Sequence, residues 1–311
     1  MMNQNNIEEA VKNIQIDTNE STKKSIVINQ NNYDILIIAY QDWANTGYRF
    51  SKCLEIIGLN VKIIKMKKHK NNYPEQAEIY NGISKLEECF PLTIKIDEYI
   101  RNLIKESYIL NLHASTYIDS ENKFDYGNIN TLVTHGGTTY RKYPNLNNKI
   151  YNSFVKKTII QCPDLLNLGA KNEVLVYYPI DSENITPDFS FKHENKLIIG
   201  HFPSSTSVKG TKKIISVINK LKNKYSDKFI YIGSSETHAD IVSWEENLKR
   251  YKKCDIIIET VNEKQNGKPY GEWGNTCLEA SISGCIVLTN CHSKNIYLKE
   301  YNCEPEFMIT N

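Results

Sequence analysis

The segment Tyr33-Asp34-Ile35-Leu36-Ile37-Ile38-Ala39 decides the fold class of this chain. A short, continuous apolar run of this kind is typical of a strand that is buried on both faces of a parallel sheet. After a polar turn, residues 46–57 carry apolar side chains at helical spacing and end at Gly58, which predicts a helix with Asn45 or Thr46 as its cap. The segment therefore predicts a strand–turn–helix unit.

The same alternation of strand and helix recurs along the rest of the chain. Further strands are expected at residues 61–65, 108–112, 131–133, 158–161 and 173–177, and then at 196–200, 229–232, 255–258 and 285–289. Helices are expected at residues 96–104, 164–168, 209–221, 236–250 and 275–283. Repeated strand–helix units connect by right-handed crossovers and form a parallel sheet with helices on both faces. The chain is therefore predicted to be α/β.

The alternation is interrupted once, which indicates two domains. We expect a flexible polar tail at residues 1–31, an N-terminal Rossmann-like domain at 32–180, a hinge or linker at 181–195 and a C-terminal Rossmann-like domain at 196–311. The last domain ends soon after its final predicted strand, which indicates either a truncated domain or an unusually short end. Because doubly wound sheets bind ligands at the carboxyl ends of their strands, two facing domains with an interdomain cleft are predicted.

The composition and the missing motifs exclude several classes of function. The 38 basic and 36 acidic residues leave a formal charge of +2, which disfavours binding to nucleic acid. No run of about 18 apolar residues predicts a membrane span, and the Asn-rich N-terminus does not resemble a secretory signal. The eight cysteines are scattered without a CxxC pair, so we expect free thiols, no metal site and a cytoplasmic protein. The motifs GxGxxG, GxxxxGK[ST] and GxSxG do not occur, which disfavours dinucleotide chemistry, a P-loop and a hydrolase elbow.

Residues 269–289 form the most informative stretch for function. Gly274-Asn275-Thr276 opens a predicted helix directly after an irregular loop, and Glu279 lies on the first turns of that helix. Free N–H groups and the positive end of the helix dipole form an anion site that suits phosphate. A carboxylate there can accept hydrogen bonds from vicinal hydroxyls, such as those of a ribose. The alternative is an ordinary helix cap with a solvated glutamate.

A second stretch, residues 199–211, points to the same chemistry. A predicted strand ends in the hydroxyl-rich loop Ser204-Ser205-Thr206-Ser207, and Lys209 follows at the start of a helix. A cation beside free N–H groups again suits a diphosphate. The alternative is a solvated lysine at the tip of a loop.

These two stretches resemble those of GT-B glycosyltransferases of the large retaining family 4. The segment Pro203 to Thr211 resembles that family's donor-diphosphate loop, and Glu279-Ala280, Gly284 and Val287 resemble the end of its two-glutamate motif. Residues 34–58, 132–141 and 162–166 also resemble segments of these enzymes. The resemblance extends over residues 34–290 and is strongest after residue 196.

The resemblance implies transfer of a sugar from a UDP- or GDP-linked donor to a hydroxyl of a glycan, lipid-linked or protein acceptor. Lys209, Ser205 and the amides of Gly274–Thr276 would hold the donor diphosphate, Glu279 its ribose and Glu272 its sugar. No metal ion and no cofactor besides the nucleotide sugar are implied, because the lysine and the helix dipole neutralise the leaving charge.

For the N-terminal domain, the resemblance implies the acceptor side of the reaction. His113 follows a predicted strand at its carboxyl end and would accept a hydrogen bond from the sugar or the acceptor. His135 competes for that role, and Arg141 is expected on the same side. Gly47 would let the backbone approach the donor closely. The alternatives are structural, hydrogen-bonded histidines and an ordinary turn at Gly47.

Two departures from the family pattern keep other functions open. The lysine loop has hydroxyl residues where the family usually has an arginine, and Glu272 and Glu279 are one residue closer together than the family's glutamates, so the family position falls on Gly271. A catalytically inactive nucleotide-sugar-binding protein is therefore an alternative, as is a GT-B-like epimerase or phosphorylase. The basic run Lys62–Lys70 indicates either a peripheral contact with an anionic membrane or a solvated loop.

Overall fold

The computed structural model describes residues 32–68, 77–80, 92–118, 124–180, 182, 185–189, 196–265, 267–270, 274–302 and 308–309. These residues form two compact units. Unit 1 consists mainly of the chain up to Tyr177 together with a short segment from Leu298, and unit 2 consists mainly of Tyr178–Tyr297. The predicted tail at 1–31 and most of the predicted linker at 181–195 lie outside the described residues.

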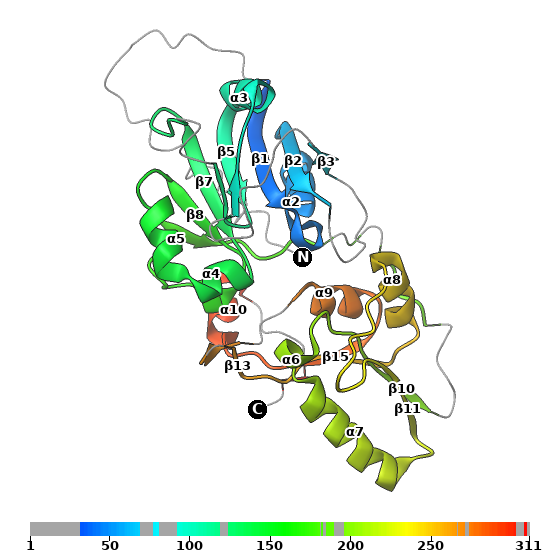
Figure 1. Ribbon diagram of the computed structural model, residues 1–311. Helices are drawn as coiled ribbons and strands as arrows, with labels where there is room; N and C mark the ends of the chain where they lie inside the picture. Colours follow the sequence, from blue (N-terminus) through cyan, green and yellow to red (C-terminus); the bar gives the residue numbers. More distant parts are fainter. Residues whose placement is uncertain are drawn as a thin grey trace. The chain divides into compact units, whose positions relative to one another are not determined.

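Unit 1 is built on a seven-stranded parallel sheet (Figure 1). Its strand order is β3-β2-β1-β5-β7-β8-β9. The strands are β1 (Tyr33–Gln41), β2 (Val61–Lys67), β3 (Glu78–Ile79), β5 (Ser107–His113), β7 (Asn130–His135), β8 (Lys157–Ile160) and β9 (Glu173–Leu175). A small parallel pair, β4 (Leu92–Ile94) and β6 (Thr116–Ile118), accompanies the sheet.

The first strand shows why this sheet is covered on both faces. Leu36 and Ile38 of β1 belong to one buried cluster, which includes residues of helix α3 (Glu98–Lys105). Ile35 and Ile37 belong to a second cluster, which includes residues of helix α2 (Thr46–Ile56). Successive side chains of a strand point to opposite faces, so a continuous apolar run fills two cores. The predicted doubly covered strand is confirmed.

Three short helices of unit 1 differ from the sequence prediction. Residues 164–168 were expected to form a helix, but the chain forms a single 3-10 turn there, η3 (Pro163–Leu165), because Leu166 is extended. The helices α4 (Thr138–Lys142) and α5 (Pro144–Tyr151) were not predicted. Pro144 occupies the first turn of α5, where its missing N–H costs no hydrogen bond.

Unit 2 contains a five-stranded parallel sheet of order β11-β10-β12-β15-β16. The strands are β10 (Leu197–His201), β11 (Phe229–Gly233), β12 (Ile256–Thr260), β15 (Ile286–Thr289) and β16 (Met308–Ile309). The helices are α6 (Thr206–Lys209), α7 (Thr211–Tyr225), α8 (Trp244–Lys252) and α9 (Asn275–Ile282), and β13 (Lys264–Gln265) pairs with β14 (Lys268–Pro269). Helix α10 (Lys294–Tyr301) begins in unit 2, and its part from Leu298 onward belongs to unit 1. Apolar clusters again form on both faces, one with α8 and α9 and the other with α7.

Two helix predictions in unit 2 were wrong, each for a local reason. The helix expected at 209–221 is divided into α6 and α7 by Gly210, which has a φ of +76°. The helix expected at 236–250 begins only at Trp244. Its start is set by Ser243, the N-cap, whose hydroxyl accepts a hydrogen bond from the N–H of Glu246.

The strand orders locate the positions where ligands bind in sheets of this kind. In unit 2, β10 lies between β11 and β12, so the chain reverses direction across the sheet at the β10–β12 pair. In unit 1 the corresponding reversal lies at the β1–β5 pair. Ligands bind at such switch points, outside the carboxyl ends of the strands. The predicted α/β class with two Rossmann-like parallel units is confirmed, and the GT-B assignment and the cleft stay predictions.

Candidate functional site

Lys209 lies at the switch point of unit 2. It ends helix α6, in the loop that follows β10. Its carbonyl oxygen accepts hydrogen bonds from the N–H of Val261, at 3.2 Å, and from the hydroxyl of Thr260, at 3.4 Å. Asn262 holds the same turn by donating to the carbonyls of Ser207 and Val208. The lysine loop is therefore fastened to the carboxyl end of β12.

The side chain of Lys209 is paired with Glu259, the penultimate residue of β12. The ammonium donates a hydrogen bond to Oε1 of Glu259 and lies 5.5 Å from the centre of the Tyr270 ring. The lysine side chain is 17% exposed and the glutamate side chain only 3%. Burial alone would lower the pKa of Lys209, but the attraction of Glu259 outweighs it and raises the pKa. The lysine is therefore positively charged at neutral pH.

Helix α9 begins beside this ion pair. Gly274 is its N-cap, and a Cβ placed on Gly274 would lie 3.2 Å from Oε1 of Glu259 and 4.0 Å from Nζ of Lys209. The first N–H groups of a helix have no acceptor within the helix. Cys277, on the first turn, is buried, and burial raises the pKa of its thiol, which is therefore neutral. The structure thus brings together Lys209 and the segment Gly274–Thr276.

The other residues that were predicted to bind the nucleotide-sugar donor lie in different surroundings. Glu279 is buried, and its Oε1 accepts a hydrogen bond of 2.9 Å from the indole N–H of Trp244 on α8. Ser205 is the N-cap of α6, with its hydroxyl 3.3 Å from that of Ser207. Oδ1 of Asn275 is buried and has no hydrogen-bond partner within the described residues. Glu272 lies outside the described part of the chain.

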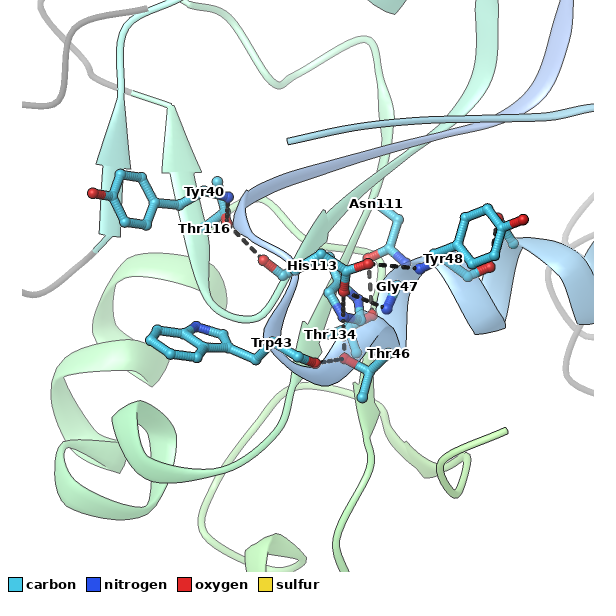
Figure 2. A network of polar contacts seen from close by, with 11 residues as sticks. Tyr40, Trp43, Thr46, Gly47, Tyr48, Asn111, His113, Thr116 and Thr134 are labelled. Atoms are coloured by element: carbon cyan, nitrogen blue, oxygen red, sulfur yellow. Dashed lines mark hydrogen bonds and ion pairs between the residues drawn. The ribbon is translucent and has the colours of Figure 1, made fainter. Parts of the chain in front are cut away.

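A second polar cluster lies at the switch point of unit 1 (Figure 2). Asp42 follows β1, and its carboxylate accepts hydrogen bonds from the N–H of Gly47, at 2.7 Å, and of Tyr48, at 2.9 Å. Asn45 is the N-cap by position, but its side chain makes no capping bond, and so the predicted cap by Asn45 or Thr46 is replaced by Asp42. A carboxylate at this end of a helix is favoured by the helix dipole.

Gly47 is surrounded by side chains of this cluster. A Cβ at Gly47 would lie 3.1 Å from Asp42, from the ring of His113 and from Ile63. The absence of a side chain at Gly47 thus makes room for these three residues. Its N–H is already bound to Asp42. The predicted approach of the backbone to the donor stays a prediction.

The hydrogen bonds of His113 determine which ring nitrogen carries its proton. The hydroxyl of Thr46 donates to the carbonyl of Trp43, and it lies 3.0 Å from Nε2 of His113. Because the single hydroxyl proton is used in the first contact, Nε2 must be the donor in the second. Burial lowers the pKa of His113, although Asp42 opposes this effect, so the ring is neutral. Nδ1 is therefore a bare acceptor, and among the described residues it has no hydrogen-bond partner.

The backbone on both sides of this switch point is strained. Ala44 and Asn45, after β1, and Ala114 and Ser115, after β5, all have φ between +53° and +59°. Residues other than glycine adopt this conformation at a cost, and such residues cluster at functional sites. The hydroxyl of Tyr151 supports the second turn by donating to the carbonyl of Ser115 at 2.6 Å.

His135 and Arg141 are held by structural contacts. The ring of His135 is stacked on Tyr140 at 4.1 Å, and its Nδ1 lies 2.8 Å from the hydroxyl of Ser115. Burial lowers the pKa of His135 to about 3. Arg141 makes two hydrogen bonds to Asp164, and both side chains are buried. These contacts correspond to the structural alternative for both residues, and their acceptor-side role stays a prediction.

The basic run Lys62–Lys70 does not form one exposed surface. Lys65 is fully buried in β2, and Lys62 is paired with Glu78. Residues 69 and 70 lie outside the described residues. In the part of the chain that the structure describes, no helix has the length and apolarity to cross a bilayer.

Two charged residues of these clusters, Asp42 and Glu259, were not predicted from the sequence. Each of them lies at the carboxyl end of an apolar strand segment, and both are buried. An acidic residue at the carboxyl end of a buried strand is a usable signal, because a buried charge requires a partner. In each case the partner is a group outside the strand.

Neither a protein-family model nor a curated protein matches this chain. Among the solved structures, sucrose-phosphate synthase from Thermosynechococcus elongatus matches with a TM-score of 0.45 and 11% sequence identity. The match covers 82% of this chain and 80% of that chain. The similarity is too low to transfer an activity.

Proposed function

We propose that this protein is a glycosyltransferase that moves a sugar from a nucleotide-sugar donor to an acceptor hydroxyl. The observation that carries the proposal is the position of the Lys209 ammonium, 4.0 Å from where a Cβ of Gly274 would lie, at the N-terminus of α9 and at the switch point of the sheet. A cation and unpaired helix N–H groups converge there, which is the arrangement that binds a diphosphate. The sequence resemblance supports the same assignment.

In this proposal unit 2 holds the donor. Lys209, Ser205 and the amides of Gly274, Asn275 and Thr276 bind the diphosphate and stabilise the charge that develops on it when the sugar leaves. Glu279 binds the ribose, sharing its carboxylate between ribose hydroxyls and the indole of Trp244. Glu272 contacts the donor sugar. A lysine and a helix dipole supply the positive charge that a metal ion provides elsewhere, so transfer is expected to be independent of metal.

Unit 1 holds the acceptor in this proposal. The bare Nδ1 of His113 accepts a hydrogen bond from a hydroxyl of the sugar or of the acceptor, which orients that group. The departing phosphate takes the proton of the attacking hydroxyl on the same face of the sugar, with retention of configuration. His135 and Arg141 act on the acceptor side through the packing that they maintain.

The proposal is tested by thermal-shift measurements with UDP-, GDP- and ADP-sugars, followed by a donor-hydrolysis assay with and without EDTA. We expect one nucleotide series to raise the melting temperature, since a ligand that binds only the folded state stabilises it. We also expect slow release of nucleoside diphosphate that EDTA does not abolish. If no nucleotide sugar shifts the melting temperature, the proposal is wrong.

A nucleotide-sugar-binding protein without turnover is the second candidate. It is favoured by the lysine loop, which has Ser204–Ser207 in place of a second cation, and by Glu259, which compensates the charge of Lys209. Such a protein would shift its melting temperature but release no nucleoside diphosphate. A phosphorylase would contain pyridoxal phosphate bound to a lysine, which would be visible in its absorbance, and an epimerase would convert the donor sugar without an acceptor.

Replacing His113 by phenylalanine is expected to lower the turnover of sugar transfer about 10- to 100-fold, while donor affinity changes less than about twofold. Phenylalanine keeps an aromatic ring but has neither ring nitrogen, so the acceptor Nδ1 and the contact of Nε2 with Thr46 are both lost. The loss of one hydrogen bond to a reacting group has about this effect on turnover, and the unfolding midpoint reports the effect of the lost Thr46 contact. Turnover and the donor Kd are measured separately, together with the unfolding midpoint. Tyr108→Phe, an exposed change on the same strand β5, is the control. An H113F variant with full turnover would exclude a catalytic role.

A further inference from the structure

The carboxylate of Glu259 lies where an anion is expected to bind, at the N-terminus of α9. Glu259 is 4% exposed. Its Oε1 is bound to Lys209 and lies next to Gly274. Its Oε2 is buried and has no hydrogen-bond partner among the residues that the structure describes. One oxygen of this carboxylate is therefore satisfied by the protein and the other is not.

An unsatisfied acceptor of this kind indicates what the ligand must offer. A buried polar atom without a partner is costly, and the cost is greater for a charged group. Oδ1 of Asn275, one residue beyond Gly274, is also buried without a partner within the described ranges. Both atoms can only accept hydrogen bonds, one as a carboxylate oxygen and the other as an amide oxygen. A ligand that satisfies both oxygen atoms must carry hydrogen-bond donors, and hydroxyl groups are such donors.

We propose that Glu259 binds hydroxyl groups of the donor sugar through Oε2, while its Oε1 holds Lys209 toward the diphosphate. This inference rests on the proposed function and names a further substrate-binding residue for it. The charge of Glu259 also orients the donor, because it repels the phosphates and attracts hydroxyls, so that only one end of the nucleotide sugar suits this side of the site.

The test compares each nucleotide sugar with the matching nucleoside diphosphate, using UDP-glucose with UDP, GDP-mannose with GDP and ADP-glucose with ADP. Isothermal titration calorimetry measures both Kd values for the wild type, for Glu259→Gln and for Glu259→Asp. The amide variant keeps an acceptor for Lys209 and the volume of the side chain. The aspartate variant keeps the charge beside Lys209 but withdraws the carboxylate by one methylene. The control is Asp227→Asn, which changes an exposed carboxylate just before the edge strand β11, whereas Glu259 lies in the central strand β12.

We expect the wild type to bind the nucleotide sugar more tightly than the nucleoside diphosphate. The ratio of the diphosphate Kd to the nucleotide-sugar Kd should fall about tenfold or more in Glu259→Gln and in Glu259→Asp. Affinity for the diphosphate should be unchanged or higher in Glu259→Gln, since Lys209 loses a competing anion. Equal losses of affinity for both ligands would show that Glu259 only positions Lys209, and would overturn the inference. A wild type that binds the nucleotide sugar no more tightly than the diphosphate would also overturn it. If the wild type binds neither ligand, the proposed function itself is wrong, and the inference is overturned with it.

Discussion

Replacing Lys209 by methionine is expected to destabilise unit 2 by about 3–5 kcal/mol and to lower nucleotide affinity at least about tenfold. The destabilisation arises because the variant leaves Glu259, which is almost fully buried, without its counter-ion. The loss of affinity arises because the site no longer has a cation beside the N–H groups of α9. Stability is measured by urea unfolding with hydrogen exchange in peptides of β12, and affinity by titration calorimetry with the best ligand of the nucleotide screen.

The double variant Lys209→Met/Glu259→Gln separates these two effects. Removing both charges leaves no buried ion without a partner, so most of the lost stability should return. Nucleotide affinity should stay low, because the cation is still absent. If the double variant is stable and binds nucleotides as tightly as the wild type, Lys209 has a structural role only, and the diphosphate site lies elsewhere.

Replacing Arg141 by methionine is expected to destabilise unit 1 by about 3–5 kcal/mol. Arg141 makes two hydrogen bonds to Asp164, one of them 3.0 Å long, and the Asp164 side chain is only 2% exposed. Methionine keeps the apolar part of the side chain but leaves the aspartate charge buried and unpaired. The measurement is urea unfolding, with hydrogen exchange in the peptides of α4 and η3 as the local readout.

The double variant Arg141→Met/Asp164→Asn is the control for this prediction. It removes both charges, so we expect most of the stability to return, and donor affinity should equal that of the wild type throughout. A single variant that unfolds like the wild type but loses affinity for the acceptor would contradict a structural role. It would instead support a role of Arg141 in binding the acceptor.

The candidate donor site was predictable in part from local sequence. The Gly274-Asn275-Thr276 turn and Lys209 each belong to a short stretch with a recognisable pattern, and the structure brings the two stretches together. Glu259 was not predicted, because its stretch contains only an apolar strand and one acid. Its partner is 50 positions away along the chain, and no local pattern links residues at that separation.

The candidate acceptor site was predicted less completely. His113 was expected at the carboxyl end of its strand, and it lies there. Asp42 was not assigned a role, although its carboxylate replaces the predicted cap of α2. The protonation of His113 could not be predicted either, because it follows from Thr46, which is 67 positions away. Arg141 was expected on the acceptor side, and its partner Asp164, which comes from a turn 23 positions later, was not predicted.

The alternation of strands and helices, the parallel sheets and the two stretches that are proposed to bind an anion followed from the order of residues along the chain. This was possible because burial on one or two faces and the capping of a helix end each depend on a few consecutive residues. The ion pairs, the proton on His113 and the unsatisfied oxygen of Glu259 followed from the folded chain. Each of these features depends on charged and polar groups from distant segments that are buried together in the folded chain. The strength of the interactions between these groups is set by the low polarity of the protein interior.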